Sequence, residues 1–531
     1  MSIPLLSTLI FFPVLGGLSL LAVDRQQTGT IRLMALFIAL IEFALSLPVF
    51  LFFDKTTHLM QFVEHHRWIP ALNINYTLGV DGISVLFLLL TTLIILLSIL
   101  VSWEAITDKV PEFFISLLLL EGAMIGVFCA TDFFLFYIFW EAMLIPMFLI
   151  MSGLLNGIFA SLDGMLFYIF FEASLIPLYL IIGVWGGPNR IYATLKFFLY
   201  TLIGSLLMLV GIILLYLNGG HTFDILRLAG QSYPLELQLI LFWAFFAAFA
   251  VKVPMWPVHT WLPDAHTEAP AAGSVILAGV LIKMGAYGFL RFSMPILPQA
   301  TQAMMVPMLV LSVIAIVYGA IVCLAQTDLK RLVAYSSVSH MGFVTLGLFA
   351  LNQRGLEGGI LQMINHGVVT GALFLAIGMV YERTHTREIV HYGGLATTMP
   401  VFAGFFLLFT LAAVGLPGTN GFIGEFLILL GGFERLPWTA VVAASGLILG
   451  AWYMLWLYQR IFFNGVNERV QGLAELNLRE ILTLAPMVLL IFWIGLYPNA
   501  LLSFLHVSVA HLVEQVHVGG LAPMVGAVLQ P

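Results

Sequence analysis

Long apolar runs separated by short polar stretches follow one another along the whole chain. Fifteen runs are long enough for a membrane-spanning helix, which needs about 20 consecutive apolar residues. The longest polar stretch between them, 54–81, is too short for a water-soluble domain, and the tail 498–531 is too mixed to assign. The run 398–431 is long enough to be a span broken by an unwound stretch. The pattern predicts spans at 3–23, 31–53, 82–103, 113–131, 133–153, 156–185, 195–217, 237–256, 271–292, 304–325, 332–351, 358–381, 398–431, 437–463 and 480–497.

Composition supports the same interpretation. The chain is 61% hydrophobic and 9% charged, with a mean hydropathy of +1.06, whereas a soluble protein is nearer half apolar and a quarter charged. In lipid the backbone must form its own hydrogen bonds, and the alternating pattern of a β-barrel is absent. We therefore predict an all-α polytopic membrane protein. The first run has no basic segment before it and no cleavage site, so we interpret it as a retained helix.

Several function classes lack their signatures. There is no GxGxxG after a strand and no Walker loop, so the sequence predicts no NAD or ATP site. Two cysteines cannot supply the four thiolates of an iron–sulfur cluster. The net charge of −7, with scattered basic residues, gives no footprint for nucleic acid. We expect no cofactor of its own and no nucleic-acid partner.

An internal repeat interrupts the regular pattern. Residues 126–150 are echoed by 157–181 at an offset of 31, and both copies carry a glutamate, Glu141 in the first and Glu172 in the second. Adjacent helices of the same sequence cannot both span in the same direction. An odd extra span would also invert the orientation of every helix after it.

The positive-inside rule distinguishes two topologies. With Lys252 and Lys283 placed inside helices, the loop lysines and arginines divide 12 to 6 if the two copies together make one crossing. They divide 11 to 7 if both copies cross. The rule favours fourteen crossings, with both termini outside and the lysine-rich loops in the cytoplasm.

Charged residues inside the apolar runs are the main functional signal. Each one costs about 2.5–3.5 kcal/mol at the bilayer centre. Glu141, Glu172, Lys252, Lys283 and Glu425 lie in such positions, with Lys252 just before a proline and Glu425 after a glycine- and proline-containing break. They could be snorkelling or ion-paired structural residues. Lys283 has apolar sequence on both sides, which makes snorkelling difficult, and we favour a series of titratable sites.

Histidines extend this set. His340 and His366 lie in successive membrane-length runs, which favours a titratable role over a purely structural one. A further cluster has metal-ligand residue types but no zinc spacing, and it follows a proline-containing break. We prefer a polar, water-lined break to a metal site there. The cluster comprises His259, Asp264, His266 and Glu268.

Long motifs at these positions resemble a known family, the antiporter-like subunits of respiratory complex I (NADH–quinone oxidoreductase) and Mrp-type cation/proton antiporters. The similarity covers nearly the whole chain, and Glu425 resembles the M-type subunit (mitochondrial subunit 4 type), since the L-type has lysine there. The chain ends 34 residues after its last clear span, too short for the long lateral helix of the L-type. The motifs are Val251–Pro254, His259–Pro270, Lys283, Ala325–His340 and Gly394.

The resemblance implies about fourteen transmembrane helices in a single membrane domain, 1–531, with two inverted five-helix repeats that each contain a broken helix. It implies N-terminal helices at 1–112, a first repeat with the tandem duplication at 113–300, a second repeat at 301–463, and a C-terminal helix and tail at 464–531. It also implies a place in the bacterial cytoplasmic (inner) membrane beside the other antiporter-like subunits. Redox chemistry would occur in different subunits of the complex, and this chain would bind no NADH, flavin, cluster or quinone.

The resemblance also assigns roles. Glu141 or Glu172 would pair with Lys252, and protons would pass by Lys283 and the two histidines to an exit site at Glu425. The family has the duplicated segment once, so either glutamate could face Lys252; we lean slightly to Glu141. Two other functions stay open: an Mrp-type sodium/proton antiporter subunit, or a structural membrane scaffold whose charges only form ion pairs.

Overall fold

The computed structural model describes most of the chain. The duplicated segment lies almost entirely outside the described residues, and so do Glu141 and Glu172. Which copy spans the membrane therefore stays a prediction. The described residues are 4–57, 59–69, 74–82, 84–106, 110–129, Tyr168, Tyr179, Ile182, Gly183, 186–223 and 225–528.

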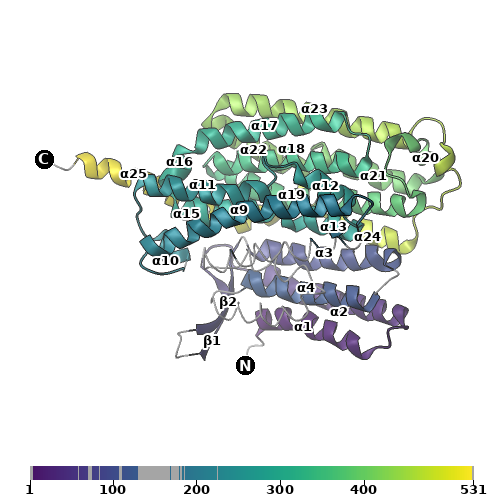
Figure 1. Cartoon of the computed structure of the whole chain (residues 1–531), viewed down its shortest axis with the longest axis horizontal. Coiled ribbons are helices and arrows are strands. Elements are labelled where there is room, and N and C mark those ends of the chain that lie inside the picture. The colour runs from purple at the N-terminus through teal and green to yellow at the C-terminus, as the bar shows by residue number, and fades with distance from the viewer. Residues whose placement is uncertain are drawn as a thin grey trace.

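Long helices lie side by side and make up nearly all of the described structure (Figure 1). In the described part of the chain twelve helical stretches, eleven of these helices and the composite span Ala271–Ile296, are long and apolar enough to cross a membrane, which confirms the all-α polytopic prediction. The exact number of fourteen stays a prediction. The long helices are α1 (Leu5–Ser19), α2 (Thr28–Leu51), α3 (Ser84–Ala105), α4 (Val110–Cys129), α9 (Arg190–Asn218), α11 (Leu235–Lys252), α17 (Met305–Leu324), α18 (Leu329–Phe349), α19 (Gln353–Thr384), α21 (Pro400–Ala413), α22 (Asn420–Arg435), α23 (Pro437–Phe462), α24 (Leu478–Leu496) and α25 (Asn499–Val528).

Helices α1 to α4 form one layer, and the later helices lie above it in Figure 1. Within this layer α1 and α2 both pack on α4, while α3 also contacts α19 and α24 of the main bundle. α3 is therefore the helix that joins the two parts. Short helices and 3₁₀ turns connect the spans: η1 (Leu20–Ala22), α10 (Ile225–Ala229), α16 (Pro298–Ala303), η5 (Ile389–His391), α20 (Leu395–Thr398) and η6 (Glu468–Val470).

Two helices are broken, as the sequence predicts. α11 ends at Lys252, and the helix resumes as α12 (Trp261–Glu268) after a stretch that contains two prolines, which cannot donate backbone hydrogen bonds. The second break separates α21 from α22. There Gly415 (φ +76°) and Gly418 (φ +93°) adopt left-handed backbone conformations that suit glycine.

The span that carries Lys283 is continuous but irregular. It consists of α13 (Ala271–Ile276), the π-helix η3 (Leu277–Leu281), α14 (Lys283–Gly288), the π-helix η4 (Phe289–Ser293) and α15 (Met294–Ile296). π-Helical turns are rare and frequently occur at functional sites. The sequence predicted a regular span at 271–292, and nothing in the pattern signalled these turns.

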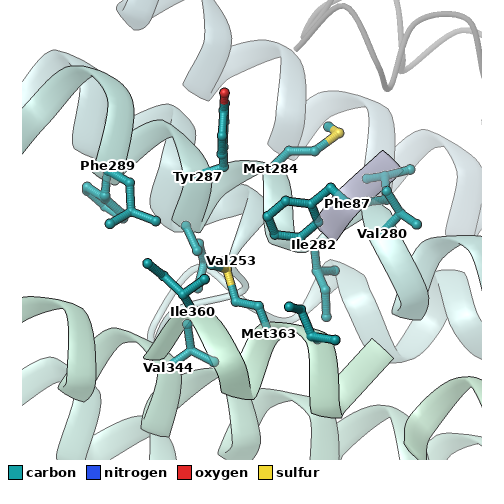
Figure 2. Packing of buried hydrophobic residues seen from close by; sticks show 14 of the residues in the cluster. Phe87, Val253, Val280, Ile282, Met284, Tyr287, Phe289, Val344, Ile360 and Met363 are labelled. Atoms are coloured by element: carbon teal, nitrogen blue, oxygen red, sulfur yellow. The ribbon is translucent and has the colours of Figure 1, made fainter. Parts of the chain in front are cut away.

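Apolar side chains enclose this span (Figure 2). They come from the span itself, from α3, α18 and α19, and from the first break. An ionised group held in such packing needs a partner, because burying an unpaired charge is very costly. The residues labelled in Figure 2 are each at most 3% exposed: Phe87, Val253, Val280, Ile282, Met284, Tyr287, Phe289, Val344, Ile360 and Met363.

One end of the bundle differs from the sequence prediction. The stretch 54–81, expected to be a polar loop, contains an antiparallel hairpin of β1 (Gln61–Ile69) and β2 (Ile74–Val80). β-Branched and aromatic residues in both segments favour strands. The sequence pattern identified this stretch only as polar sequence between spans, and it did not predict the hairpin.

The tail that the sequence left unassigned forms α25, at the same end as the hairpin (Figure 1). Phe504 stacks on Phe50 at the end of α2, with ring centroids 4.8 Å apart. Nδ1 of His506 lies 2.8 Å from Glu357 near the start of α19. α2 ends and α19 begins at this face of the bundle, so α25 runs across the helix ends. Although it is apolar enough to span, its contacts make it a lateral helix.

Candidate functional site

Lys252 occupies the first helix break. It is the last residue of α11 and is fully buried, with its ammonium 5.9 Å from the ring centroid of Phe197. The C-terminal end of a helix carries a partial negative charge, which favours a cation there. The two glutamates predicted to pair with it, Glu141 and Glu172, lie outside the described residues, so this pairing stays a prediction.

Lys283 lies in the irregular span and is also fully buried. Its ammonium donates a hydrogen bond to the carbonyl of Ala278, one turn back in η3. Its Nζ also lies 2.7 Å from Nδ1 of His366 on α19. The π-helical turns thus supply a backbone acceptor for this lysine, and α19 supplies an imidazole.

Glu425 occupies the second broken helix, in the first half of α22. It is 3% exposed. Its Oε1 lies 3.3 Å from Nδ1 of His340 and accepts a hydrogen bond of 3.2 Å from the side-chain amide of Gln362. The carboxylate is therefore held between α18 and α19, which carry these two partners.

Two glycines allow this close approach. A Cβ at Gly424 would collide with the amide oxygen of Gln362, and one at Gly415 would lie 2.6 Å from Oε2 of Glu425. Real Cβ atoms essentially never come so close to another heavy atom. The break sequence thus provides both the turn and the space for the carboxylate.

A small cavity lies between the two histidines, whose ring centroids are 5.9 Å apart. It has room for about one water molecule. Three polar atoms of its lining residues have no hydrogen-bond partner among the residues that the structure describes: Asn365 Oδ1, His366 Nε2 and Glu425 Oε2. Buried waters usually satisfy such atoms. We define the polar path as this cavity together with four residues: Lys283, His366, His340 and Glu425.

The predicted polar cluster after the first break resolves into ion pairs. Nζ of Lys196 lies 2.7 Å from Asp264, and Arg387 lies 3.6 Å from Glu268. His259 packs against aromatic rings. In the described part of the chain no group of three or more His, Cys, Asp or Glu is placed to hold a metal ion. Both carboxylates already face a cation, which leaves little for a metal to bind.

Two buried residues were not assigned to the path by sequence reasoning. His266 stacks on Phe374, with centroids 4.6 Å apart, and lies within electrostatic range of Lys283 and Lys330. Lys330 was counted as a loop residue, but it is 7% exposed and donates to the carbonyl of Ala269, just after α12. Lys330 lies two residues before the predicted span 332–351, so the apolar pattern alone does not place it inside the bundle.

The structure thus brings most of the predicted residues together. Lys283, His366, His340 and Glu425 are neighbours, although they come from four helices. Lys252 is connected to them through backbone packing, because Gly285 lies against Val253, the residue after Lys252. Two pairs of titratable groups at hydrogen-bond distance, with a water-sized cavity between them, can pass protons from one group to the next.

Comparison with known proteins identifies the class. The model of the family "NADH:quinone oxidoreductase/Mrp antiporter, TM" matches residues 161–450. The chain belongs to this family. It is 47% identical to NADH-quinone oxidoreductase subunit M of Rhodobacter capsulatus, over 97% of both chains. It is 45% identical to NADH-ubiquinone oxidoreductase chain 4 of Marchantia polymorpha, over 96% of this chain and 97% of that one. The predicted family and its M type are confirmed.

Solved structures agree. Respiratory complex I from Thermus thermophilus contains a chain 33% identical to this one, with a TM-score of 0.79, over 96% of this chain and 99% of that one. A chain of the Mrp complex from Dietzia sp. has a TM-score of 0.76 at 20% identity, over 98% and 99%, which shows the shared fold alone. Together with the twelve candidate spans, these relatives confirm a multi-pass protein of the bacterial cytoplasmic membrane.

Proposed function

We propose that this chain is a proton-translocating membrane subunit of NADH–quinone oxidoreductase, driven by quinone reduction elsewhere in the complex. The observation that carries the proposal is the polar path, in which Lys283 contacts His366 at 2.7 Å and His340 contacts Glu425 at 3.3 Å inside apolar packing. Such a row is costly in a membrane protein. A purely structural role would be served equally well by apolar residues.

Each residue has a role in this proposal. Lys252, with Glu141 or Glu172 beside it, is the first site, and the opposite charge tunes how readily the lysine releases its proton. Lys283 is the central site, and His366 and His340 relay protons by way of the cavity. Glu425 is the exit-side site. The two broken helices mark the two inverted repeats, 113–300 and 301–463.

A larger cavity provides an approach from one side of the membrane. It has a volume of about 640 Å³ and is lined by charged residues that include Glu268, Lys330 and Arg387. Lys330 contacts the carbonyl that follows α12, and both Lys330 and Lys283 act electrostatically on His266 of α12. Protons would enter here and reach the central lysine. On the predicted topology this side is the cytoplasm.

The chain acts without redox chemistry of its own in this proposal. Oxidation of NADH and reduction of quinone take place in other subunits, and neighbouring antiporter-like subunits are its partners in the membrane. The contribution of this chain is a set of titratable groups whose protonation follows the state of the complex.

Replacing Glu425 by glutamine tests the proposal. Glu425→Gln keeps the shape of the side chain but cannot release a proton, so proton pumping per NADH oxidised should fall at least about tenfold while the complex assembles. The matched control is Glu434→Gln on the same helix. Glu434 is half-exposed and pairs with Arg354 at the surface, where such a pair contributes little. The Glu434→Gln enzyme should pump protons at the normal rate.

Pumping would be measured as the pH gradient formed in membrane vesicles with NADH and quinone, with NADH oxidation recorded in parallel. Normal pumping by the Glu425→Gln enzyme would contradict the proposal and favour a scaffold whose charges are structural. A pH gradient that depends on sodium would favour the antiporter alternative instead.

A further inference from the structure

Two buried glutamates lie outside the polar path. Glu42 is in the middle of α2 and Glu121 in the middle of α4, and both are 0% exposed. α2 packs on α4, and the charge of Glu42 acts on Glu121. Each glutamate is a single acidic residue in an otherwise apolar run, and sequence reasoning passed over both.

Neither carboxyl group has a partner among the residues that the structure describes. All four oxygen atoms are buried without a hydrogen bond. Arg32 is the only basic residue inside the four helices α1, α2, α3 and α4. It lies ten residues from Glu42, about 15 Å along α2. Its guanidinium donates to the carbonyl of Ile106 at 2.9 Å. The other acidic residues of these helices are Glu104, near the end of α3, and Glu112, in the first turn of α4.

Two unpartnered carboxylates cannot both be ionised in this place. An isolated buried charge is so costly that such groups become neutral instead. A second negative charge close by adds repulsion, so that at least one of the two holds a proton. Electrostatics therefore favours a protonated acid over an ion pair or an anionic pair.

The surroundings are polar but separated from the polar path. Ser46 on α2 and Thr92 on α3 lie 3.1 Å apart through their hydroxyl groups. On its other side α3 contacts the span that carries Lys283, since a Cβ at Gly279 would be 3.6 Å from Ile94.

We propose that Glu42 and Glu121 form a second proton-binding site, a carboxyl pair that retains at least one proton at neutral pH. The site lies in the layer of α1 to α4 and is separated from the polar path by α3. Its ligand is a proton rather than a metal cation, since Glu42 and Glu121 are the only acidic residues that the described helices α1 to α4 hold away from a helix end. The inference does not depend on the proposed function, because it concerns the protonation of residues outside the path.

Infrared spectroscopy of the intact complex tests the pair directly. A protonated carboxylic acid has a C=O stretch that is distinct from the bands of a carboxylate, and no reagent has to reach the site. The double variant Glu42→Gln/Glu121→Gln should lose acid C=O intensity equivalent to one or two groups relative to the unmodified complex. If the double variant does not assemble, the single variants Glu42→Gln and Glu121→Gln carry the same comparison.

Glu112→Gln is the matched control on α4. Glu112 lies 3.5 Å from Arg25 and is partly exposed, so its replacement should remove carboxylate intensity but no acid intensity. Loss of carboxylate bands alone from the Glu42 and Glu121 variants would overturn the proposal. Carboxylate bands of the pair that shift when sodium or magnesium is added would overturn it as well, since they would show a cation site.

Discussion

The cavity between His340 and His366 makes a prediction that does not remove any titratable group. Ala413, at the end of α21, contributes to its lining. The cavity holds about one water molecule, so the two additional methyl groups of Ala413→Val would occupy the space of that water. The histidines, 5.9 Å apart between ring centroids, would then lose their connection.

The expected magnitude follows from the hydrogen bonds that the water makes. Hydrogen bonds to charged groups contribute about 1.5–3 kcal/mol, and each 1.4 kcal/mol in a barrier changes a rate about tenfold. Excluding the water should therefore slow proton transfer along the path roughly ten- to a hundredfold. Overpacking a core costs about 1–3 kcal/mol, which a large assembled complex can tolerate.

The assay is proton uptake into vesicles per NADH oxidised, compared with Ala403→Val. Ala403 is also buried on α21, about 15 Å from Ala413 along the helix, and it does not line the cavity. This control adds the same volume to the same helix. If both variants pump at the rate of the unmodified complex, the reasoning that water connects the two histidines is wrong. If both fail equally, the effect is one of packing and not of the cavity.

Two further predictions concern close contacts. Asp81→Asn should lower the melting temperature of the complex by removing the partner of Arg291, 2.5 Å away, because breaking a buried ion pair costs about 3–5 kcal/mol. Burial alone would raise the pKa of Asp81, but the Arg291 guanidinium holds it below its usual value. The stability that this ion pair contributes is therefore present at neutral pH and is lost as the pH falls below about 4. Gly424→Ala should reduce pumping, because its Cβ would displace Gln362 from Glu425, whereas Gly404→Ala, which adds a Cβ in open space, should pump normally.

Much of the fold follows from hydrophobic pattern alone. Runs of about 20 apolar residues can satisfy their backbone in lipid only as helices, so the spans and both broken helices were predictable. The hairpin β1–β2 and α25 were not, because both lie at the helix ends, where burial is set by neighbouring elements. Phe504 is covered by Phe50, and no local pattern in the tail reveals that contact.

The candidate site was predicted in its members but not in its geometry. Charges inside apolar runs identified Lys283 and Glu425, since their cost demands a reason. The sequence does not show that His366 contacts Lys283 or that His340 contacts Glu425, because these contacts join helices that are far apart along the chain. Gln362 was not predicted for a different reason. An uncharged amide in an apolar run gives no strong functional signal, although this one donates a hydrogen bond to the Glu425 carboxylate.

Backbone irregularity is what Lys252 and the charged groups of the polar path share. Lys252 ends a helix, Lys283 follows a π-helical turn, and Glu425 lies in the helix that follows a glycine-containing break. Free carbonyls and amides at such places can stabilise a charge without a permanent counterion, which leaves the group able to change its protonation. Glu42 and Glu121 lie in the middle of α2 and α4, away from a helix end or a π-helical turn, so they lack this help from the backbone. In the proposed function this difference allows the path to carry moving protons, whereas the carboxyl pair is expected to retain one.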